Sequence, residues 1–210
     1  MPATINGPRW DTLERVERAV EKVRDRLQRA VRALEQSGID YAVLGGHAVA
    51  AWVAQVDEGA VRNTPDVDIL LRKEDLSLAR AALARVGFVH HRVRGWDVFL
   101  DGPDAPERDS VHIVFAGERL SNELAPYPDI GDSQRGPEFK VVSLEALVGT
   151  KLSAWRLKDR MHLQDLWEVG LIDESWVGRF PGELGQRLEN LLDTAEENCS
   201  LSYRTRELED

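Results

Sequence analysis

This 210-residue chain contains little cysteine and no long apolar run. Its single cysteine, Cys199, excludes an intramolecular disulfide and any zinc site built from several cysteines. No apolar stretch approaches the ~20 residues that a membrane span requires. The polar N-terminus lacks the apolar core of a secretion signal. These absences favour a cytoplasmic enzyme or binding protein that does not enter a membrane.

Positive charge is also scarce, since 27 Lys and Arg face 37 Asp and Glu and give a net charge of −10. Such a chain does not hold nucleic acid by bulk charge, so general DNA binding is not expected, and a polyanion requires a local basic patch. Residues 150–160 form one, because four bases there face only Asp159. The bases are Lys151, Arg156, Lys158 and Arg160. Composition and length suit one compact globular domain, or one domain with a small helical appendage.

The hydrophobic patterning predicts an α/β (α+β) fold, a mixed sheet flanked by helices. Apolar residues spaced by three and four predict a long helix over residues 10–36 with Asp11 as its N-cap. This brace helix (1–37) precedes an α/β core (38–142) and a helical C-terminal region (143–210) that packs on the core. Strands are expected at 41–45, 66–71, 88–93, 96–100, 111–115 and 139–142, helices at 47–54, 75–86, 144–155, 159–169 and 182–198, and loops at 57–65 and 118–137.

Asp66 and Asp68 lie two positions apart in an apolar strand. Side chains at such positions point to the same face of a sheet, so the two carboxylates stand close together. A cation relieves their repulsion, and Mg²⁺ suits them because it keeps water and phosphate oxygens as its other ligands. The alternative interpretation is a strand edge with two solvated aspartates.

Gly45 and Gly46 join a buried strand to a helix, about twenty residues before the aspartates. Glycines at this junction let a phosphate approach the first N–H groups of the helix. Arg62 and Thr64, in the segment that leads into the acidic strand, are further candidates for phosphate contact. The alternatives are a strand–helix turn that needs glycine for geometry alone and a loop in which Thr64 satisfies backbone groups.

Two segments carry a resemblance to a known family: VLGGHAVAAW and, further on, RNTPDVDILL. They resemble the nucleotidyltransferase superfamily with the DNA polymerase β-like fold, and in particular small bacterial members such as the minimal nucleotidyltransferases and the AbiEii-type toxins. The stretch KLSAWRLKDRMHLQDLWEVGLID is similar to a later motif of that family. The resemblance extends over residues 41–173 and is more specific for the fold than for the substrate.

The resemblance implies that Gly45 and Gly46 hold a triphosphate and that Asp66 and Asp68 bind catalytic Mg²⁺ (or Mn²⁺). It also implies that two residues of the later motif line the nucleotide or acceptor side, namely Lys151 and Asp165. If this stretch is helical, Lys151 and Lys158 are seven residues apart and share a face. The alternative is a solvated helix face on which Lys158, His162 and Asp165 pair with one another.

One position departs from the family pattern. Active members carry a third carboxylate on a following strand, where this chain has His112. A histidine near its ordinary pKa of about 6.5 can serve as general base for a hydroxyl, but it is a poorer Mg²⁺ ligand than a carboxylate. The alternatives are a half-buried strand histidine, or spatial replacement of the missing acid by Asp97 or Asp109.

The sequence therefore predicts an enzyme that moves a nucleoside monophosphate from an NTP such as ATP to an acceptor hydroxyl and releases pyrophosphate. The acceptor, a small molecule, a tRNA end or a protein side chain, stays open, as does a homodimer. Catalysis is assigned to Asp66, Asp68 and His112, and nucleotide binding to Gly45, Gly46, Arg62, Thr64, Lys151 and Asp165. The alternative functions are a catalytically decayed module that binds a nucleotide or a protein, and a toxin–antitoxin component. The six tryptophans favour core and helix packing over base stacking.

Overall fold

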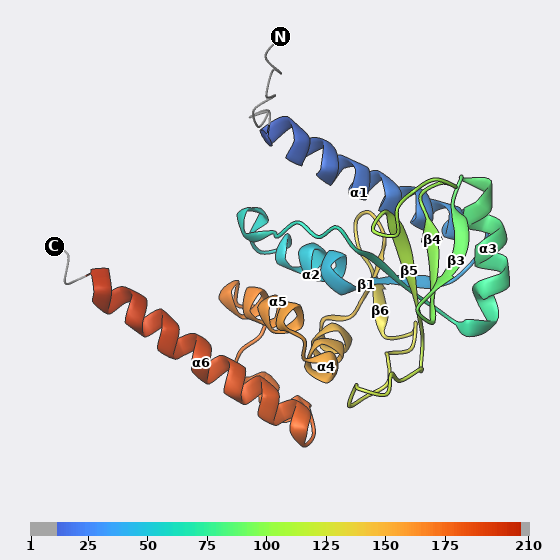
Figure 1. Ribbon diagram of the computed structural model, residues 1–210. Helices are drawn as coiled ribbons and strands as arrows, with labels where there is room; N and C mark the ends of the chain where they lie inside the picture. The colour runs from blue at the N-terminus through green and yellow to red at the C-terminus, as the bar shows by residue number, and fades with distance from the viewer. Residues whose placement is uncertain (1–11, 207–210) are drawn as a thin grey trace, which may run out of the picture.

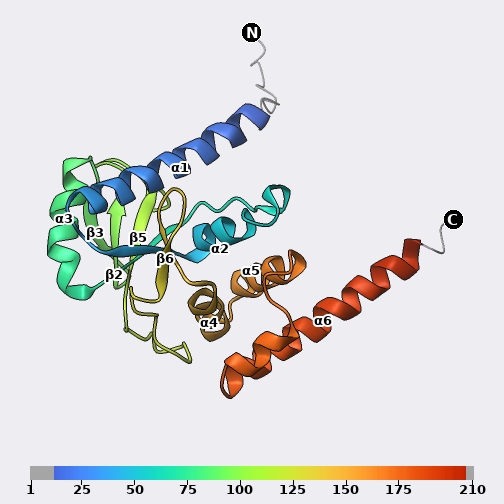
Figure 2. The same cartoon turned by 180° about the vertical axis from the view of Figure 1, so that it is seen from behind.

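The computed structural model describes residues 12–206, with side chains through residue 195. The predicted N-cap Asp11 lies outside the described residues, as do Trp10 and the side chain of Cys199. The long N-terminal helix, α1 (Thr12–Gln36), is present. Its second half buries an apolar stripe on the body of the protein, whereas its first turns extend away from it (Figures 1 and 2).

A seven-stranded mixed sheet forms the centre of the fold, in the order β3-β4-β5-β2-β1-β7-β6. The strands are β1 (Tyr41–Leu44), β2 (Val67–Leu71), β3 (Val89–Val93), β4 (Trp96–Leu100), β5 (Ser110–Phe115), β6 (Ser133–Arg135) and β7 (Lys140–Val142). Strand β2 pairs antiparallel with β1 and parallel with β5, and β1 pairs parallel with β7. The predicted mixed α/β fold is confirmed.

Helices cover both faces of the sheet (Figures 1 and 2). The other helices are α2 (Gly45–Val53), α3 (Leu76–Arg85), α4 (Leu144–Ala154), α5 (Leu157–Glu168) and α6 (Glu183–Arg206). Short 3-10 turns occupy Glu58–Ala60, Lys73–Asp75 and Glu174–Arg179. One hydrophobic cluster lies between the sheet and helices α1 and α3. The other joins the sheet to α2 and the C-terminal helices.

The alternation of side chains along β2 separates these two faces. Val67, Ile69 and Leu71 are buried in the cluster under α1 and α3. Leu70 joins the opposite cluster, and the period of two places Asp68 on that same side. The central strand therefore presents a dry surface to one layer and a carboxylate to the other.

Three sequence expectations need correction. Strand β6 lies within the predicted loop 118–137, because its three residues form an edge strand too short and polar to show alternation. Helix α2 begins at Gly45 itself, so both glycines belong to its first turn. The break predicted between the helices 144–155 and 159–169 is present, because the left-handed backbone of Trp155 (φ 53°) ends α4. The second helix, α5, starts earlier than predicted, at Leu157.

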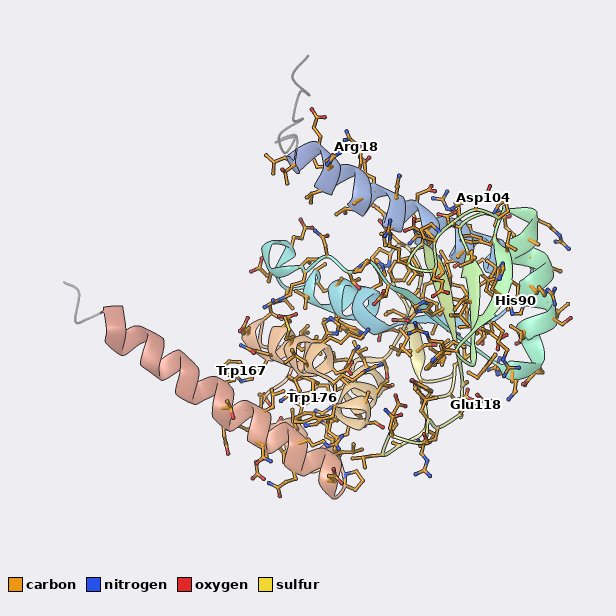
Figure 3. All side chains as sticks on the ribbon, in the orientation of Figure 1. Arg18, His90, Asp104, Glu118, Trp167 and Trp176 are labelled. Carbon is orange, nitrogen blue, oxygen red and sulfur yellow. The ribbon has the colours of Figure 1, made fainter. Side chains whose placement is uncertain are left out.

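Among the described residues no helix is both long and apolar enough to cross a membrane. The tryptophans at described positions pack at the margin of the cluster that joins sheet and C-terminal helices, as the sequence predicted. Figure 3 shows Trp167 and Trp176 beside these helices, on the other side of the molecule from His90 on β3. The helical C-terminal region thus shares one core with the sheet.

Candidate functional site

A cavity of about 540 Å³ opens on the face of the sheet that carries α2, α4 and α5. Its walls come from the ends of β1 and β2, the neighbouring strands β4 and β5, and the α4–α5 turn. It gathers most of the residues singled out in the sequence, namely Gly45, Gly46, Thr64, Asp66, Asp68, His112 and Lys151. Segments far apart in the chain therefore meet at one place.

The two aspartates lie on one wall of the cavity, each beside a cationic or protonatable group. Asp66 directly precedes β2, and its Oδ2 is 3.4 Å from Lys158 Nζ. Asp68, the second residue of β2, has its Oδ1 3.4 Å from His112 Nδ1. Both carboxylates keep contact with solvent, so each has room for a ligand beyond these partners.

His112 faces Asp68 because β5 runs parallel to β2 with these two residues in register. The contact with Asp68 raises the pKa of His112, although burial opposes this shift. Burial alone would raise the pKa of Asp68, but contacts with His112 and the charge of Lys151 hold it below its ordinary value. The geometry therefore favours an ionised carboxylate beside an imidazole that readily takes up a proton.

The glycine pair gives the Asp68 carboxylate and the Thr64 side chain direct access to the first turn of α2. A Cβ on Gly45, whose φ is +69°, would lie 2.0 Å from Asp68 Oδ2. A Cβ on Gly46 would lie 2.6 Å from Thr64 Oγ1. The side chain of the N-cap residue, Leu44, makes no capping hydrogen bond, so the N-terminus of this helix favours an anion.

The α4–α5 turn gives the cavity a cationic lining, with Lys151, Arg156 and Lys158, and Arg94 adds a fourth cation from the β3–β4 turn. Lys151 is only 3% exposed and donates to Asp159 Oδ1 over 3.1 Å. Burial lowers the pKa of Lys151, while Asp159 opposes the shift. Lys151 and Lys158 do not share one helix face, because the break at Trp155 places them on different helices.

The structure does not bring Arg62 and Asp165 into this cavity. Arg62 Nε donates to Asp165 Oδ1 over 2.7 Å, and Arg62 lines a separate apolar groove between α1 and α2. Burial raises the pKa of Asp165, although Arg62 opposes the shift. Their guanidinium–carboxylate pair instead ties the segment before β2 to α5.

Neither acid considered as a replacement for the third carboxylate lies in the site. Asp97 is in register with Ile113, which places it on the opposite face of the sheet, where His90 Nε2 lies 2.8 Å from its Oδ1. Asp109 pairs with Arg26 at 3.0 Å. The acid that does line the cavity besides Asp66 and Asp68 is Glu107, from the loop before β5.

Several lining residues escaped the sequence reasoning. Tyr127 comes from the predicted loop 118–137, and its hydroxyl donates to Glu123 over 3.1 Å. His162 on α5 has a buried Nδ1 without a hydrogen-bond partner among the described residues, and burial lowers its pKa to about 4. Arg156 and Lys158 did carry a sequence signal, because both belong to the basic cluster at 150–160.

The donor set fits a hard divalent cation. Within the described residues no group of three or more His, Cys, Asp and Glu side chains is placed to hold a metal by itself. Mg²⁺ does not need one, because in nucleotide sites one or two carboxylates suffice when phosphate oxygens and water complete the shell. Asp66 and Asp68 supply such a pair at the edge of a cavity that is also lined by cationic side chains.

Comparison with known proteins places the chain beside nucleotidyltransferases. Residues 9–124, more than half of the chain, match a family described as uncharacterised nucleotidyltransferase. No curated protein matches. Similar solved structures include an antigenic nucleotidyltransferase-like protein from Paracoccidioides brasiliensis, which is 15% identical and aligns over 87% of this chain and 91% of its own, with a TM-score of 0.48.

Two further structures resemble the fold at comparable distance. The antibiotic-resistance factor ANT(2'')-Ia is 14% identical, with 91% of this chain and 98% of its own covered and a TM-score of 0.45. JHP933 from Helicobacter pylori is 12% identical, with 92% and 99% covered and a TM-score of 0.44.

Proposed function

Because this chain belongs to the uncharacterised nucleotidyltransferase family, we propose that it transfers a nucleoside monophosphate from an NTP to an acceptor hydroxyl and releases pyrophosphate. One observation carries the proposal. Two carboxylates and the three cations of the α4–α5 turn line a single cavity, and the glycine-rich start of a helix forms part of its wall. This arrangement matches a metal–triphosphate, which presents both a divalent cation and phosphate oxygens.

Asp66 and Asp68 would hold Mg²⁺ or Mn²⁺. When bound, the metal supplies neutralisation of the charge that develops on the transferred phosphoryl group. The carboxylates are suited to this because both line the cavity and because carboxylate oxygen is a donor that Mg²⁺ prefers.

The remaining phosphate oxygens would be bound by the chain itself. Lys151, Arg156 and Lys158 line the same cavity and offer ammonium and guanidinium donors. The N–H groups of Gly45 and Gly46 offer the positive end of the α2 dipole. Arg62 is not assigned a phosphate here, because its guanidinium pairs with Asp165 outside the cavity.

His112 would take the proton of the acceptor hydroxyl. Its Nδ1 lies against Asp68, which leaves Nε2 as the nitrogen that accepts the proton. The group is positioned by strand register rather than by a flexible loop, which is a favourable property for a general base.

A second candidate function is a module that binds a nucleotide or a protein without turnover. It is favoured by the imidazole of His112 at the position where a third carboxylate is expected, and by the absence of a three-ligand metal group among the described residues. The acceptor class, a small hydroxyl compound, a tRNA end or a protein side chain as in a toxin–antitoxin pair, separates the possible forms of the enzyme.

The test compares Asp66→Ala and Asp68→Ala with Asp104→Asn. Asp104 lies on an exposed loop outside the cavity (Figure 3). We expect both alanine variants to fold but to lose Mg²⁺-dependent NTP binding, while the control binds as the wild type does. Incubation with labelled NTPs and Mg²⁺ then separates the two functions, because pyrophosphate release indicates the enzyme and binding without turnover indicates the module. Unchanged NTP binding in both alanine variants would sink the assignment.

A further inference from the structure

Two of the cations that line the cavity share one buried acid. Asp159, in the first turn of α5, is 0% exposed. Its Oδ1 accepts from Lys151 Nζ over 3.1 Å. Its Oδ2 accepts from Arg156 Nε over 2.7 Å and from the Arg156 backbone N–H over 3.2 Å. Both oxygens are thus occupied by groups from the two sides of the α4–α5 turn.

The backbone of this turn makes the shared acid necessary. Trp155 is left-handed, and its N–H donates to the carbonyl of Lys151 over 3.0 Å. The chain therefore reverses between Lys151 and Arg156, and their long side chains have many rotamers of similar energy. Hydrogen bonds to one immobile carboxylate remove that freedom before any ligand arrives.

We infer that Asp159 is a positioning residue that holds Lys151 and Arg156 in place for the triphosphate. This inference rests on the proposed function. Lys158, the third cation of the α4–α5 turn, contacts Asp66 instead. The turn thus contains two cations held by a buried acid and one beside a proposed metal-binding carboxylate.

Asp159 also keeps Lys151 charged. Burial lowers the pKa of Lys151, and Asp159 counteracts this effect. The other charged or titratable groups that act on the amine are Asp68, Lys158 and His162. Without the Asp159 charge, the buried amine would release its proton more easily and the phosphate wall would lose a positive charge.

The first test measures binding of inorganic tripolyphosphate with Mg²⁺ to the full chain, by calorimetry. For Asp159→Asn, which keeps the shape of the side chain, we expect binding weaker by roughly tenfold to a hundredfold, the range known for residues that orient ligands. The matched control is Asp101→Asn, because Asp101 accepts from buried Arg26 and from Arg29 on the other face of the sheet. It should lose stability and keep wild-type binding. Wild-type binding by Asp159→Asn overturns the inference.

A double-mutant cycle separates positioning from a merely structural role. In a Lys151→Met, Arg156→Met background, Asp159→Asn should weaken tripolyphosphate binding by less than about twofold, because the residues through which it acts are gone. A loss as large as in the wild-type background contradicts the inference. Should Asp159→Asn fail to fold, Asp159→Glu keeps the charge but displaces it, and the same tenfold weakening is expected.

If the wild-type chain does not bind tripolyphosphate, the proposed function fails, but the inference is still testable. The titration of the Lys151 amine, followed by NMR of ¹³C-labelled lysine, reports the Asp159–Lys151 contact without any ligand. We expect the Lys151 pKa in Asp159→Asn to lie below its value in Asp101→Asn, because the carboxylate that favours the charged amine is gone. Equal values in the two variants refute the positioning role.

Discussion

Each face of the central sheet contains a buried cation, and the acids that pair with the two cations differ in their exposure. Under α1, Arg26 is 2% exposed and pairs with Asp101 and Asp109, which both keep contact with solvent. On the other face Lys151 is equally buried, but its acid is Asp159, which is fully enclosed. The first pair closes the edge of a packed core, whereas the second borders a cavity.

The comparison teaches that burial of a cation does not by itself indicate function. Both faces contain a cation with acid partners, and both draw on alternate residues of the same strands. What distinguishes the cavity face is that its strand carboxylate, Asp68, lines the cavity, whereas Asp97, the strand carboxylate of the other face, does not. Because the cavity gives ligands access to the Asp68 carboxylate, the charged groups around it can form a binding site.

The largest difference is expected between two glycines that share a positive φ. Gly45→Ala places a Cβ 2.0 Å from Asp68 Oδ2, so the carboxylate must move. We expect Mg²⁺-dependent NTP binding to fall by about a hundredfold, the usual cost of misplacing a catalytic group by an ångström. Gly38→Ala, also at positive φ but with no atom within 4 Å of its Cβ, serves as control. It should lose about 1 kcal/mol of stability and bind normally; equal binding by the two variants would show that Asp68 tolerates displacement.

The next effect tests the two buried cations directly. Lys151→Met and Arg26→Met each remove one partner of a buried ion pair but leave another cation beside the acid, Arg156 for Asp159 and Arg29 for Asp101. We expect each variant to lose about 1–3 kcal/mol of unfolding free energy in denaturant titrations. Only Lys151→Met should weaken NTP binding, by tenfold or more. The contrast between the faces is refuted if Arg26→Met weakens binding equally.

A smaller effect concerns the pH dependence of stability, through His162 on the cavity face. Burial lowers its pKa to about 4, below the 6.5 of the unfolded chain. Between these values the unfolded state binds more protons, so the stability due to neutral His162 is complete above pH 6.5 and is lost as the pH falls towards 4. After allowance for its partial exposure, we expect a loss of roughly 1–2 kcal/mol.

His162→Gln removes this contribution, so its stability should fall less than that of the wild type over the same pH range. Glu123 and Asp165, whose pKa values are raised by burial, act with the opposite sign in both proteins and cancel in the comparison. Denaturant titrations of the two proteins at pH 7.5, 6, 5 and 4.2 give the difference. Parallel curves would mean that His162 is not buried as a neutral group.

The sequence predicted the elements that carry strong periodicity and the site residues that are neighbours in the chain. The apolar stripe of α1 and the alternation in β2 are local signals, and so are the glycine pair and Asp66-Val67-Asp68. Strand β6 was missed because a three-residue polar edge strand has no pattern to read. The sequence placed the break between the helices 144–155 and 159–169 correctly, but not the left-handed backbone of Trp155, because nothing in its residue type announces one.

Contacts between distant segments were beyond local reasoning. The role of Asp159 depends on a turn that brings Lys151 and Arg156 to one carboxylate, and Tyr127 reaches the cavity from a segment that reads as loop. The Arg62–Asp165 pair joins residues 103 positions apart, and each partner had been assigned to phosphate or nucleotide instead. Tertiary pairing of this kind follows from topology, which one sequence does not show.

The smallest expected effect tests that pair, at the boundary between the cavity and the apolar groove. The Arg62 side chain is 55% exposed, so its salt bridge should contribute less than about 1 kcal/mol. Asp165→Asn keeps a hydrogen-bond acceptor for Arg62 and removes only the charge of a solvent-screened ion pair. We therefore expect stability within 1 kcal/mol of the wild type, and NTP binding within about twofold. A tenfold loss of binding in Asp165→Asn would instead mean that the pair opens when the nucleotide binds. Asp165 would then contact the ligand, as the family resemblance implies, or Arg62 would contact phosphate, as its place before the acidic strand predicts.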